Sequence, residues 1–314
     1  MGGNVFKHHQ IDTCGSNNEL EAAVLESLSR PFKLNIDIVD ACNLKCPSCP
    51  RGSGISENTK ARMSLADFDR LLSRVTSEVK VNAIEPFNWT EPFLHPQLDQ
   101  FIGLMKKYKI GCVLSTNMSF RKPQLLENVL RHSPAILVSV SGFTQETQSI
   151  YHRASNINYI KANLEFISDF RKANNLKFKV EVHCLQFIDN QQDQLQWEKY
   201  CNDHDFIYFG KPANSFGLIT EETVARLITK PEIEVLSDGT VQPKKYYLEK
   251  PSYEFCRFHN RLTVDALGDV YLCCIYWNTE KYKVGNIFEL SLKDIQRNRM
   301  QHYDCLYCIG HREG

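Results

Sequence analysis

Short apolar runs alternate with amphipathic stretches over residues 33–212. The apolar runs are rich in β-branched and aromatic residues, which is typical of buried strands. The predicted strands are Leu34–Val39, Ala83–Asn88, Cys112–Ser115, Ala135–Val140, Lys177–Leu185 and Phe206–Phe209. The predicted helices between them are Ser64–Val79, His95–Lys107, Lys122–Arg131, Gln145–Tyr151, Tyr159–Asn174 and Gln194–Asp203. This alternation predicts the α/β class, with a parallel sheet wound by right-handed crossovers and either open or curved into part of a barrel.

The regular pattern is interrupted on both sides, which predicts four segments. They are a lead-in at 1–32 with a helix at Asn18–Ser29, the α/β unit at 33–212, an irregular crossing segment at 213–255, and a second unit at 256–314. The second unit opens with a predicted hairpin in which Leu262–Asp265 meets Val270–Leu272. Gly268 supplies the turn of that hairpin, and a helix is expected at Leu292–Arg299.

Composition narrows the class of function. The 314 residues are 42% hydrophobic, which is enough for a substantial core, and Lys+Arg equals Asp+Glu at 37 each. Because there is no basic excess, nucleic-acid binding is not expected. We also expect no membrane association, because no apolar run is long enough to span a bilayer and the N-terminal residues lack the apolar core of a signal peptide. A cytoplasmic location is therefore predicted.

Twelve cysteines are many for a chain expected in a reducing compartment, so metal binding is favoured over disulfides. Cys42, Cys46 and Cys49 follow the first predicted strand with the spacing C-x3-C-x2-C. Three thiolates on so short a loop can ligate three irons of a [4Fe–4S] cubane and leave the fourth iron open. A structural zinc site is the alternative, although zinc would need a distant fourth ligand.

At this loop the chain resembles the radical S-adenosylmethionine (radical SAM) superfamily. The resemblance implies a six-stranded partial barrel and a [4Fe–4S] cluster whose open iron binds the amino and carboxylate groups of SAM. It also implies that an electron from the cluster cleaves SAM to a 5′-deoxyadenosyl radical, with an external donor such as flavodoxin or ferredoxin supplying that electron. The protein would provide binding, orientation and exclusion of water.

The resemblance also assigns five SAM-binding residues. Glu91, in Asn-Trp-Thr-Glu-Pro, matches the carboxylate of the Gly-Gly-Glu-Pro motif and would accept a hydrogen bond from the SAM amino group. Ser115 and Asn117 match the end of the third strand, and Ser139 matches the serine at the end of the fourth. Arg153 resembles the arginine that pairs with the SAM carboxylate. The serines and Asn117 have an alternative reading as helix caps, and Glu91 and Arg153 as surface residues.

The sequence departs from the family pattern at two places beside these residues. Trp89 and Thr90 stand where the family usually has glycines, which makes backbone contacts to SAM there less certain. Ser48, before the third cysteine of the loop, stands where an aromatic residue is more usual. In the family that aromatic residue packs near the adenine.

A second cysteine group lies in the C-terminal unit, and its members are Cys256, Cys273, Cys305 and Cys308. It resembles the Twitch/SPASM extension of radical SAM enzymes, with the shorter Twitch form and one auxiliary [4Fe–4S] cluster as the closer match. Cys273 is preferred over Cys274 as the ligand from its spacing to Gly268, since adjacent thiols on a strand point to opposite faces. Structural zinc is again the alternative.

These features together predict hydrogen abstraction from a substrate C–H bond, followed by dehydrogenation or epimerisation. Cys184 and Cys274 are candidate hydrogen donors for an epimerisation, and a buried thiol with no chemical role is the alternative for each. The predicted substrate is a small carbohydrate-like molecule, and a ribosomally made peptide is the second possibility. Two other classes stay open, which are a pure electron-transfer protein and a non-catalytic zinc-binding protein.

Overall fold

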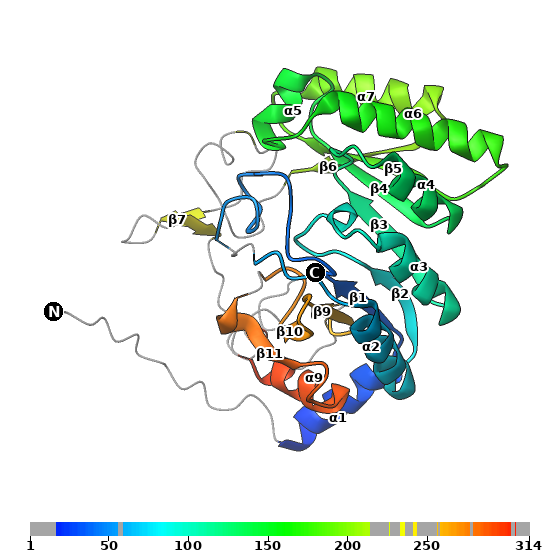
Figure 1. Cartoon of the computed structure of the whole chain (residues 1–314). Helices are drawn as coiled ribbons and strands as arrows, with labels where there is room; N and C mark the ends of the chain where they lie inside the picture. The colour runs from blue at the N-terminus through cyan, green and yellow to red at the C-terminus, as the bar shows by residue number, and fades with distance from the viewer. Residues whose placement is uncertain are drawn as a thin grey trace.

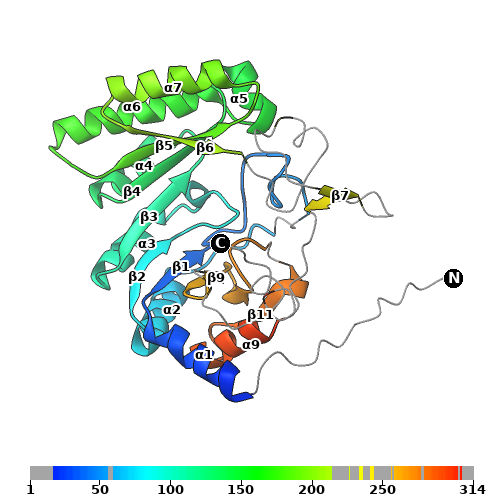
Figure 2. The same cartoon turned by 180° about the vertical axis from the view of Figure 1, so that it is seen from behind.

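The computed structural model describes residues 17–55, 59–213, 226, 233–235, 241–243, 256, 258–276, 279–302 and 305. Within them, nine strands form one sheet in the order β11-β10-β9-β1-β2-β3-β4-β5-β6. The sheet is curved, and its helices lie along the outer side, as Figures 1 and 2 show from opposite directions. A separate pair, β7 (Ile233–Val235) and β8 (Val241–Pro243), is antiparallel.

The six predicted strands of the α/β unit are confirmed, and all five pairs of neighbours among them are parallel. Their bounds are β1 Phe32–Ile36, β2 Val81–Glu85, β3 Gly111–Thr116, β4 Ala135–Val140, β5 Val180–Gln186 and β6 Ile207–Pro212. Since neighbouring strands run in the same direction, their carboxyl ends meet at one edge of the sheet. The cysteine loop starts from this edge, directly after β1 (Figure 1).

The predicted helices also form. They are α2 Leu65–Glu78, α3 Leu98–Lys107, α4 Pro123–Arg131, α5 Gln145–Tyr151, α6 Ile157–Ala173 and α7 Gln191–Asp203, with a 3-10 turn η1 at Pro92–Leu94. Side-chain caps mark several starts. The Ser64 hydroxyl accepts from the Asp67 N–H at α2, and Thr144 with Thr147 forms a capping box at α5. These caps satisfy N–H groups that the first helical turn leaves without partners.

The C-terminal hairpin joins the main sheet. β9 (Arg261–Val264) pairs with β1 in parallel, β10 (Asp269–Tyr271) pairs antiparallel with β9, and β11 (Lys283–Asn286) follows on β10 after a 3-10 turn, η2 (Glu280–Tyr282). Gly268 has φ +84°, and a Cβ there would lie 2.4 Å from the Phe288 ring, so the predicted turn glycine is required twice over. The strand pairing therefore connects the two predicted units into one sheet.

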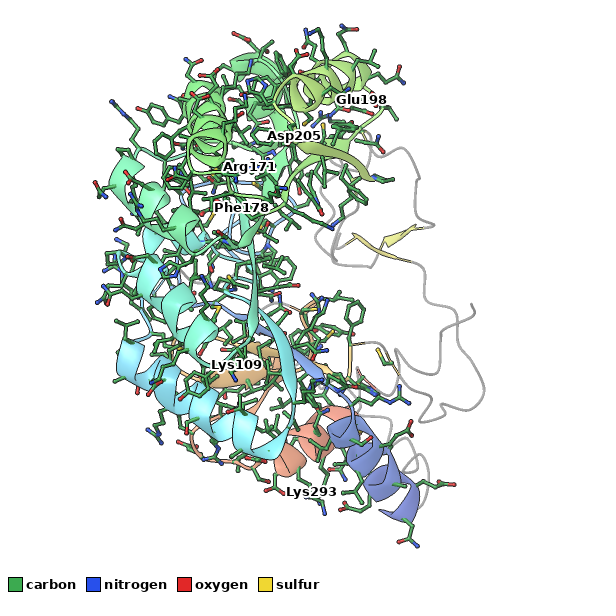
Figure 3. All side chains as sticks on the ribbon, turned by 90° about the vertical axis from the view of Figure 1, so that its right-hand side faces the viewer. Lys109, Arg171, Phe178, Glu198, Asp205 and Lys293 are labelled. Atoms are coloured by element: carbon green, nitrogen blue, oxygen red, sulfur yellow. The ribbon has the colours of Figure 1, made fainter. Side chains whose placement is uncertain are left out.

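Helix α1 (Asn17–Ser29) packs on the last helix, α9 (Leu292–Gln301). Leu20 and Val24 of α1 form a small cluster with Met300. Lys293 of α9, labelled in Figure 3, forms an ion pair with Glu21 of α1. The N-terminal helix thus belongs with the C-terminal unit in space.

A polar contact closes the opposite end of the helical layer. Arg171 of α6 forms an ion pair of 3.2 Å with Asp205 after α7, and its guanidinium lies 5.7 Å from the centroid of the Phe178 ring (Figure 3). Glu198 on α7 is also labelled in this view. The contact ties α6 to the segment that leads into β6.

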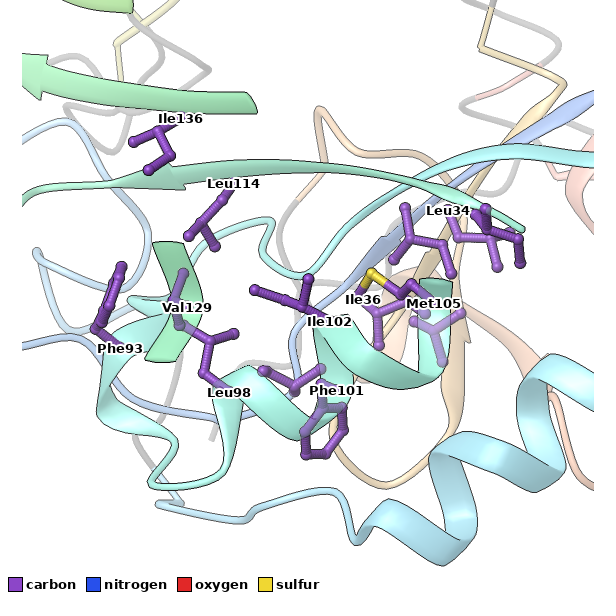
Figure 4. Close-up of a cluster of buried hydrophobic side chains, with 14 of the residues drawn as sticks. Leu34, Ile36, Phe93, Leu98, Phe101, Ile102, Met105, Leu114, Val129 and Ile136 are labelled. Carbon is purple, nitrogen blue, oxygen red and sulfur yellow. The ribbon is translucent and has the colours of Figure 1, made fainter. Parts of the chain in front are cut away.

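The main core lies between the sheet and its helices. Leu114 of β3 and Ile136 of β4 are fully buried, and Met105 of α3 lies beside Ile36 of β1, as Figure 4 shows. Strand residues alternate between two faces, so the intervening positions on β3, β4 and β5 turn toward the inner side of the curved sheet. No helix among the described residues is long and apolar enough to cross a membrane.

Candidate active site

The loop that carries Cys42, Cys46 and Cys49 begins directly after β1, and all three thiols are partly buried and free. Burial is the largest cause that raises the pKa of each thiol, and the charges of Cys49 and Cys42 further raise the pKa of Cys46. Three thiolates held so close together need added positive charge, which bound iron supplies. The three thiols therefore fit a three-cysteine cluster site.

Backbone contacts hold this loop in a compact form. The Cys49 N–H donates to the Cys46 carbonyl at 3.2 Å, and the Ser53 N–H donates to the Cys49 carbonyl at 2.8 Å. Gly52 packs directly on Cys46, because a Cβ at position 52 would lie 2.4 Å from the Cys46 backbone nitrogen. The Lys45 N–H donates to the Arg153 carbonyl at 2.9 Å, which links the loop to the segment after α5.

Asp37, which the sequence analysis did not select, anchors the motif around Glu91. Its carboxylate accepts hydrogen bonds from the Asn88 N–H at 2.6 Å, the Trp89 N–H at 3.1 Å and the Thr90 hydroxyl at 2.6 Å. Burial raises the pKa of Asp37 to about 6, against these bonds. A carboxylate inside an otherwise apolar run was the signal available in the sequence. This residue fixes the two positions where glycines were expected.

Glu91 is 2% exposed and lies between the ends of β2 and β3. Its carboxylate accepts from the Thr116 hydroxyl at 2.8 Å, the Asn117 N–H at 2.8 Å and the Phe93 N–H at 3.1 Å. Burial raises its pKa to about 7, and the charge of Glu91 in turn raises the pKa of Cys42. A carboxylate has about four acceptor positions, so one remains for a further donor.

Asn117 links β3 to the cysteine loop. Its amide donates to the Asn43 side-chain oxygen at 2.9 Å and accepts from the Ser119 N–H at 2.8 Å. The Asn43 amide donates to the Ser119 carbonyl at 2.8 Å. The side chain of Asn117 therefore has a structural role here, and its predicted contact with SAM stays a prediction.

The segment after α5 approaches the cysteine loop from the other side. The charge of Arg153 lowers the pKa of Cys46, which places this predicted residue near the thiols. The Tyr151 hydroxyl forms a hydrogen bond with the Ser48 side chain, and the charges of Cys46 and Cys49 raise the pKa of Tyr151. Tyr151 thus brings an aromatic ring to the position where Ser48 departs from the family pattern. The sequence analysis missed this residue.

The inner face of the sheet carries polar side chains. Ser115 of β3 and Ser139 of β4 lie on it, and Ser139 is in register with His183 of β5 and then with Phe209 of β6. The His183 ring contacts the Glu181 carboxylate at 2.8 Å, and the Phe209 ring lies 4.9 Å away, centroid to centroid. These residues form what we call the inner wall, which is His183, Glu181, Phe209 and Ser139.

Cys184 lies on the opposite, helix-covered face of β5 and is fully buried. Burial raises its pKa to about 12, and the buried Cys201 of α7 is its electrostatic neighbour. The alternating burial of β5 places Cys184 with Val182 on this face, which is turned away from Ser139 and His183. The position fits the alternative reading, a small core residue, and not a hydrogen donor.

The second cysteine group is described in part. Cys256 is buried, Cys273 and Cys305 are partly buried, and the Cys305 sulfur lies 3.7 Å from His259 Nε2, while Cys308 and Cys14 lie outside the described residues. Cys273 and Cys274 both follow the end of β10, and a hydrogen bond between their thiols is the largest cause that raises the pKa of Cys274. The expectation that strand alternation separates these thiols was wrong, because neither residue is in the strand.

Three comparisons bear on this geometry. Residues 256–309 match the family model SPASM, described as an iron–sulfur cluster-binding domain. A GTP 3′,8-cyclase of Aquifex aeolicus is 25% identical over 309 aligned residues, covering 89% of this chain and 93% of that protein. Streptococcus suis SuiB bound to S-adenosylmethionine has a similar fold, with TM-score 0.58, 15% identity, and coverage of 89% of this chain and 67% of SuiB. The structure of anSMEcpe with bound AdoMet gives TM-score 0.59, 16% identity, and coverage of 88% and 84%.

The fold is similar to those of SuiB and anSMEcpe, both solved with bound S-adenosylmethionine, and the three-cysteine loop follows the first strand of the sheet. The second cysteine group lies within residues 256–309, the part that matches the iron–sulfur cluster-binding domain family. Among the residues described, no group of three or more His, Cys, Asp or Glu side chains has the arrangement needed to hold a single metal ion.

Proposed function

We propose that this protein is an enzyme that removes hydrogen from an unactivated C–H bond of a small carbohydrate-like substrate and oxidises it. The observation that supports this most directly is the convergence of the three cysteines, Glu91 and Arg153 at one edge of the sheet. When bound, the cluster and SAM supply a 5′-deoxyadenosyl radical, which is strong enough to take such a hydrogen.

The residues around the loop bind and orient SAM in this proposal. Glu91, with one acceptor position left, holds the amino group, and Arg153 faces the carboxylate. Tyr151, held to Ser48 by its hydroxyl, presents its ring to the adenine. Asp37 keeps the segment before Glu91 in place through three hydrogen bonds. Ser115, Asn117 and Ser139 are the remaining predicted SAM contacts.

The inner wall supports a small polar substrate. Glu181 and His183 offer hydrogen-bonding groups to hydroxyls, and Phe209, which is 49% exposed, offers an apolar face to the C–H side of a ring. The curated relative is named for a reaction of GTP, which contains a sugar. A peptide substrate is the second candidate, because SuiB has been solved bound to its precursor peptide SuiA. That likeness is at 14% identity and concerns the fold.

Oxidation is favoured over epimerisation by the positions of the thiols. An epimerisation requires a thiol on the substrate side. Cys184 is instead buried behind the sheet, and the thiol of Cys274 forms a hydrogen bond with the thiol of Cys273. An auxiliary cluster in the SPASM domain can instead accept the second electron. A flavodoxin or ferredoxin is the proposed source of the first.

Anaerobic reconstitution tests the class of function. We expect about eight iron and eight sulfide per chain for two cubanes, and release of 5′-deoxyadenosine and methionine from SAM under reductant. Cys46→Ala should abolish SAM cleavage, and Cys201→Ala, at a core cysteine, should not. Zinc without iron would instead identify a zinc-binding protein, and iron without SAM cleavage would identify an electron-transfer protein.

The substrate class is tested by incubating the holoenzyme with amino sugars, cyclitols, GTP and short peptides. A true substrate should increase deoxyadenosine release and yield a product two hydrogens lighter. Phe209→Ala should raise KM for that substrate, and this variant should bind SAM as tightly as the wild type does. A product of unchanged mass that carries deuterium from D2O at an inverted carbon would contradict the oxidation proposal, and turnover of peptides alone would contradict the substrate class.

A further inference from the structure

Arg299 on α9 is a buried positive charge. It is 2% exposed, and among the described residues no carboxylate lies within ion-pair distance of its guanidinium. Burying an unpaired charge is unfavourable by several kcal/mol in proteins. A buried guanidinium without an anionic side chain therefore requires another source of negative charge nearby.

The guanidinium is fully used as a hydrogen-bond donor. Nε donates to the Leu272 carbonyl at 2.9 Å, and Nη2 donates to the carbonyls of Phe258 and Arg261, each at 3.0 Å. Nη1 donates to the His259 carbonyl at 2.9 Å and to the Gln296 side-chain oxygen at 2.5 Å. Four of these acceptors are backbone carbonyls and the fifth is a side-chain amide oxygen. All five are neutral, so they satisfy the N–H groups but leave the net charge uncompensated.

These acceptors lie on the segments that bear the second group of cysteines. Phe258 and His259 follow Cys256, and the His259 N–H donates to the Cys256 carbonyl at 2.8 Å. Leu272 directly precedes Cys273. Arg299 therefore connects the described cysteine-bearing segments from one central position.

The segment that bears Cys305 also lies next to a residue that Arg299 binds. The His259 ring reaches to 3.7 Å from the sulfur of Cys305, which follows α9. Arg261 also lies on this part of the sheet, at the start of β9. Arg261 is already paired with Glu85, so Arg299 is the one of the two that has no carboxylate partner within the described part of the chain.

We propose that Arg299 is the positioning residue and the counter-charge of the auxiliary iron–sulfur cluster, and that it raises the reduction potential of that cluster. A cluster bound by four thiolates is anionic and becomes more so on reduction, so a nearby fixed positive charge favours the reduced form. This inference rests on the proposed oxidation. In that step the substrate radical loses one electron to the oxidised cluster and its hydroxyl proton to water, and its C–O bond becomes a carbonyl.

The test compares Arg299→Gln with Arg297→Gln in the reconstituted holoenzyme. Arg297 is a matched control because it lies on the same helix, but it is partly exposed and is paired with Glu21 and Asp294. EPR-monitored redox titration gives the potentials of both clusters, with the SAM-binding cluster as internal reference. We expect Arg299→Gln to lower the equilibrium constant for reduction of the auxiliary cluster at least tenfold, which corresponds to a fall in its potential of about 59 mV for one electron. Arg297→Gln should change it less than threefold.

Further outcomes separate the two proposals. An auxiliary cluster that is fully loaded in Arg299→Gln with an unchanged potential would overturn this inference, whatever the enzyme does to its substrate. If Arg299→Gln does not retain the cluster, Arg299→Lys is the deciding variant because it keeps the charge. Its equilibrium constant for cluster reduction should lie within threefold of the wild-type value. A tenfold fall in that constant would refute the counter-charge role. Failure of SAM cleavage with the expected potential shift would instead count against the proposed function alone.

Discussion

Replacing Gly52 by alanine tests how the cysteine loop is built. The added Cβ would lie 2.4 Å from the Cys46 nitrogen and 2.5 Å from the Cys46 oxygen, both backbone atoms that cannot rotate away. The segment around Cys46 must therefore move by about 1 Å to reach ordinary contact distance, and overpacking of this kind costs about 1 to 3 kcal/mol. A displaced Cys46 can no longer share a cube with Cys42 and Cys49.

Gly54 provides a control on the same loop. It has φ +85°, and no atom of the described residues lies within 4 Å of the position that a Cβ would take, so alanine there meets only backbone strain of about 1 to 2 kcal/mol. The two variants thus have similar expected stability losses but different effects on Cys46. We expect reconstituted Gly52→Ala to hold about four iron fewer per chain than the wild type and to cleave SAM at least 100-fold more slowly. Gly54→Ala should keep its iron and cleave SAM within about threefold of the wild type.

Iron and sulfide content, the EPR signal of the reduced SAM-binding cluster, and deoxyadenosine release measure these outcomes. Urea unfolding of both apoproteins measures their stability separately. Full iron and a normal rate in Gly52→Ala would refute the close packing on Cys46. Equal losses in both variants would show that loop stability alone controls cluster binding.

Three further predictions concern buried polar groups. Thr116→Val removes a donor to Glu91 and should lower stability by about 1 to 2 kcal/mol and weaken SAM binding, whereas Thr263→Val, at a buried hydroxyl that has no hydrogen-bond partner among the described residues, should be neutral or stabilising in urea unfolding. Burial lowers the pKa of His152 to about 4 in the folded protein. As pH falls, the unfolded chain therefore binds a proton at this residue at a higher pH than the folded protein does. About 2 kcal/mol of the free energy of unfolding should be lost between pH 7 and 5. His152→Asn should flatten that dependence, and an unchanged slope would refute it. Cys184→Ala should lower stability by about 1 kcal/mol and leave turnover unaffected, and loss of product would restore its donor role.

Local pattern predicted the helices and strands of the α/β unit well, and it erred where tertiary contacts end a strand. The first strand was expected at Leu34–Val39, but β1 ends at Ile36 because Asp37 turns to bind the backbone of Asn88 and Trp89. Ile38 and Val39 are nevertheless buried, which explains why the apolar pattern predicted that the strand extends through them. Apolar pattern reports burial and only indirectly reports pairing.

The candidate site was predictable as far as a motif specifies it. The cysteine spacing and Glu91 could be recognised in the sequence, and Asp37 left only the signal of a carboxylate in an apolar run, whereas the partners of Tyr151 and Arg299 are distant in the chain. The parallel pairing of β9 with β1 was also missed, since nothing local records which strand a hairpin will join. The hydrogen bond between the thiols of Cys273 and Cys274 depends likewise on where β10 ends.

The pairing of β9 with β1 also determines where the two cysteine-bearing segments lie relative to each other. The loop with Cys42 leaves the carboxyl end of β1, while Cys256 precedes the amino end of β9, which lies beside the amino end of β1. The five residues of β1 span about 17 Å between the ends at which these two segments join the strand pair. Neighbouring strands in a hydrogen-bonded ladder hold that span fixed. The two cysteine-bearing segments are therefore held at a set separation, without either unit having to swing.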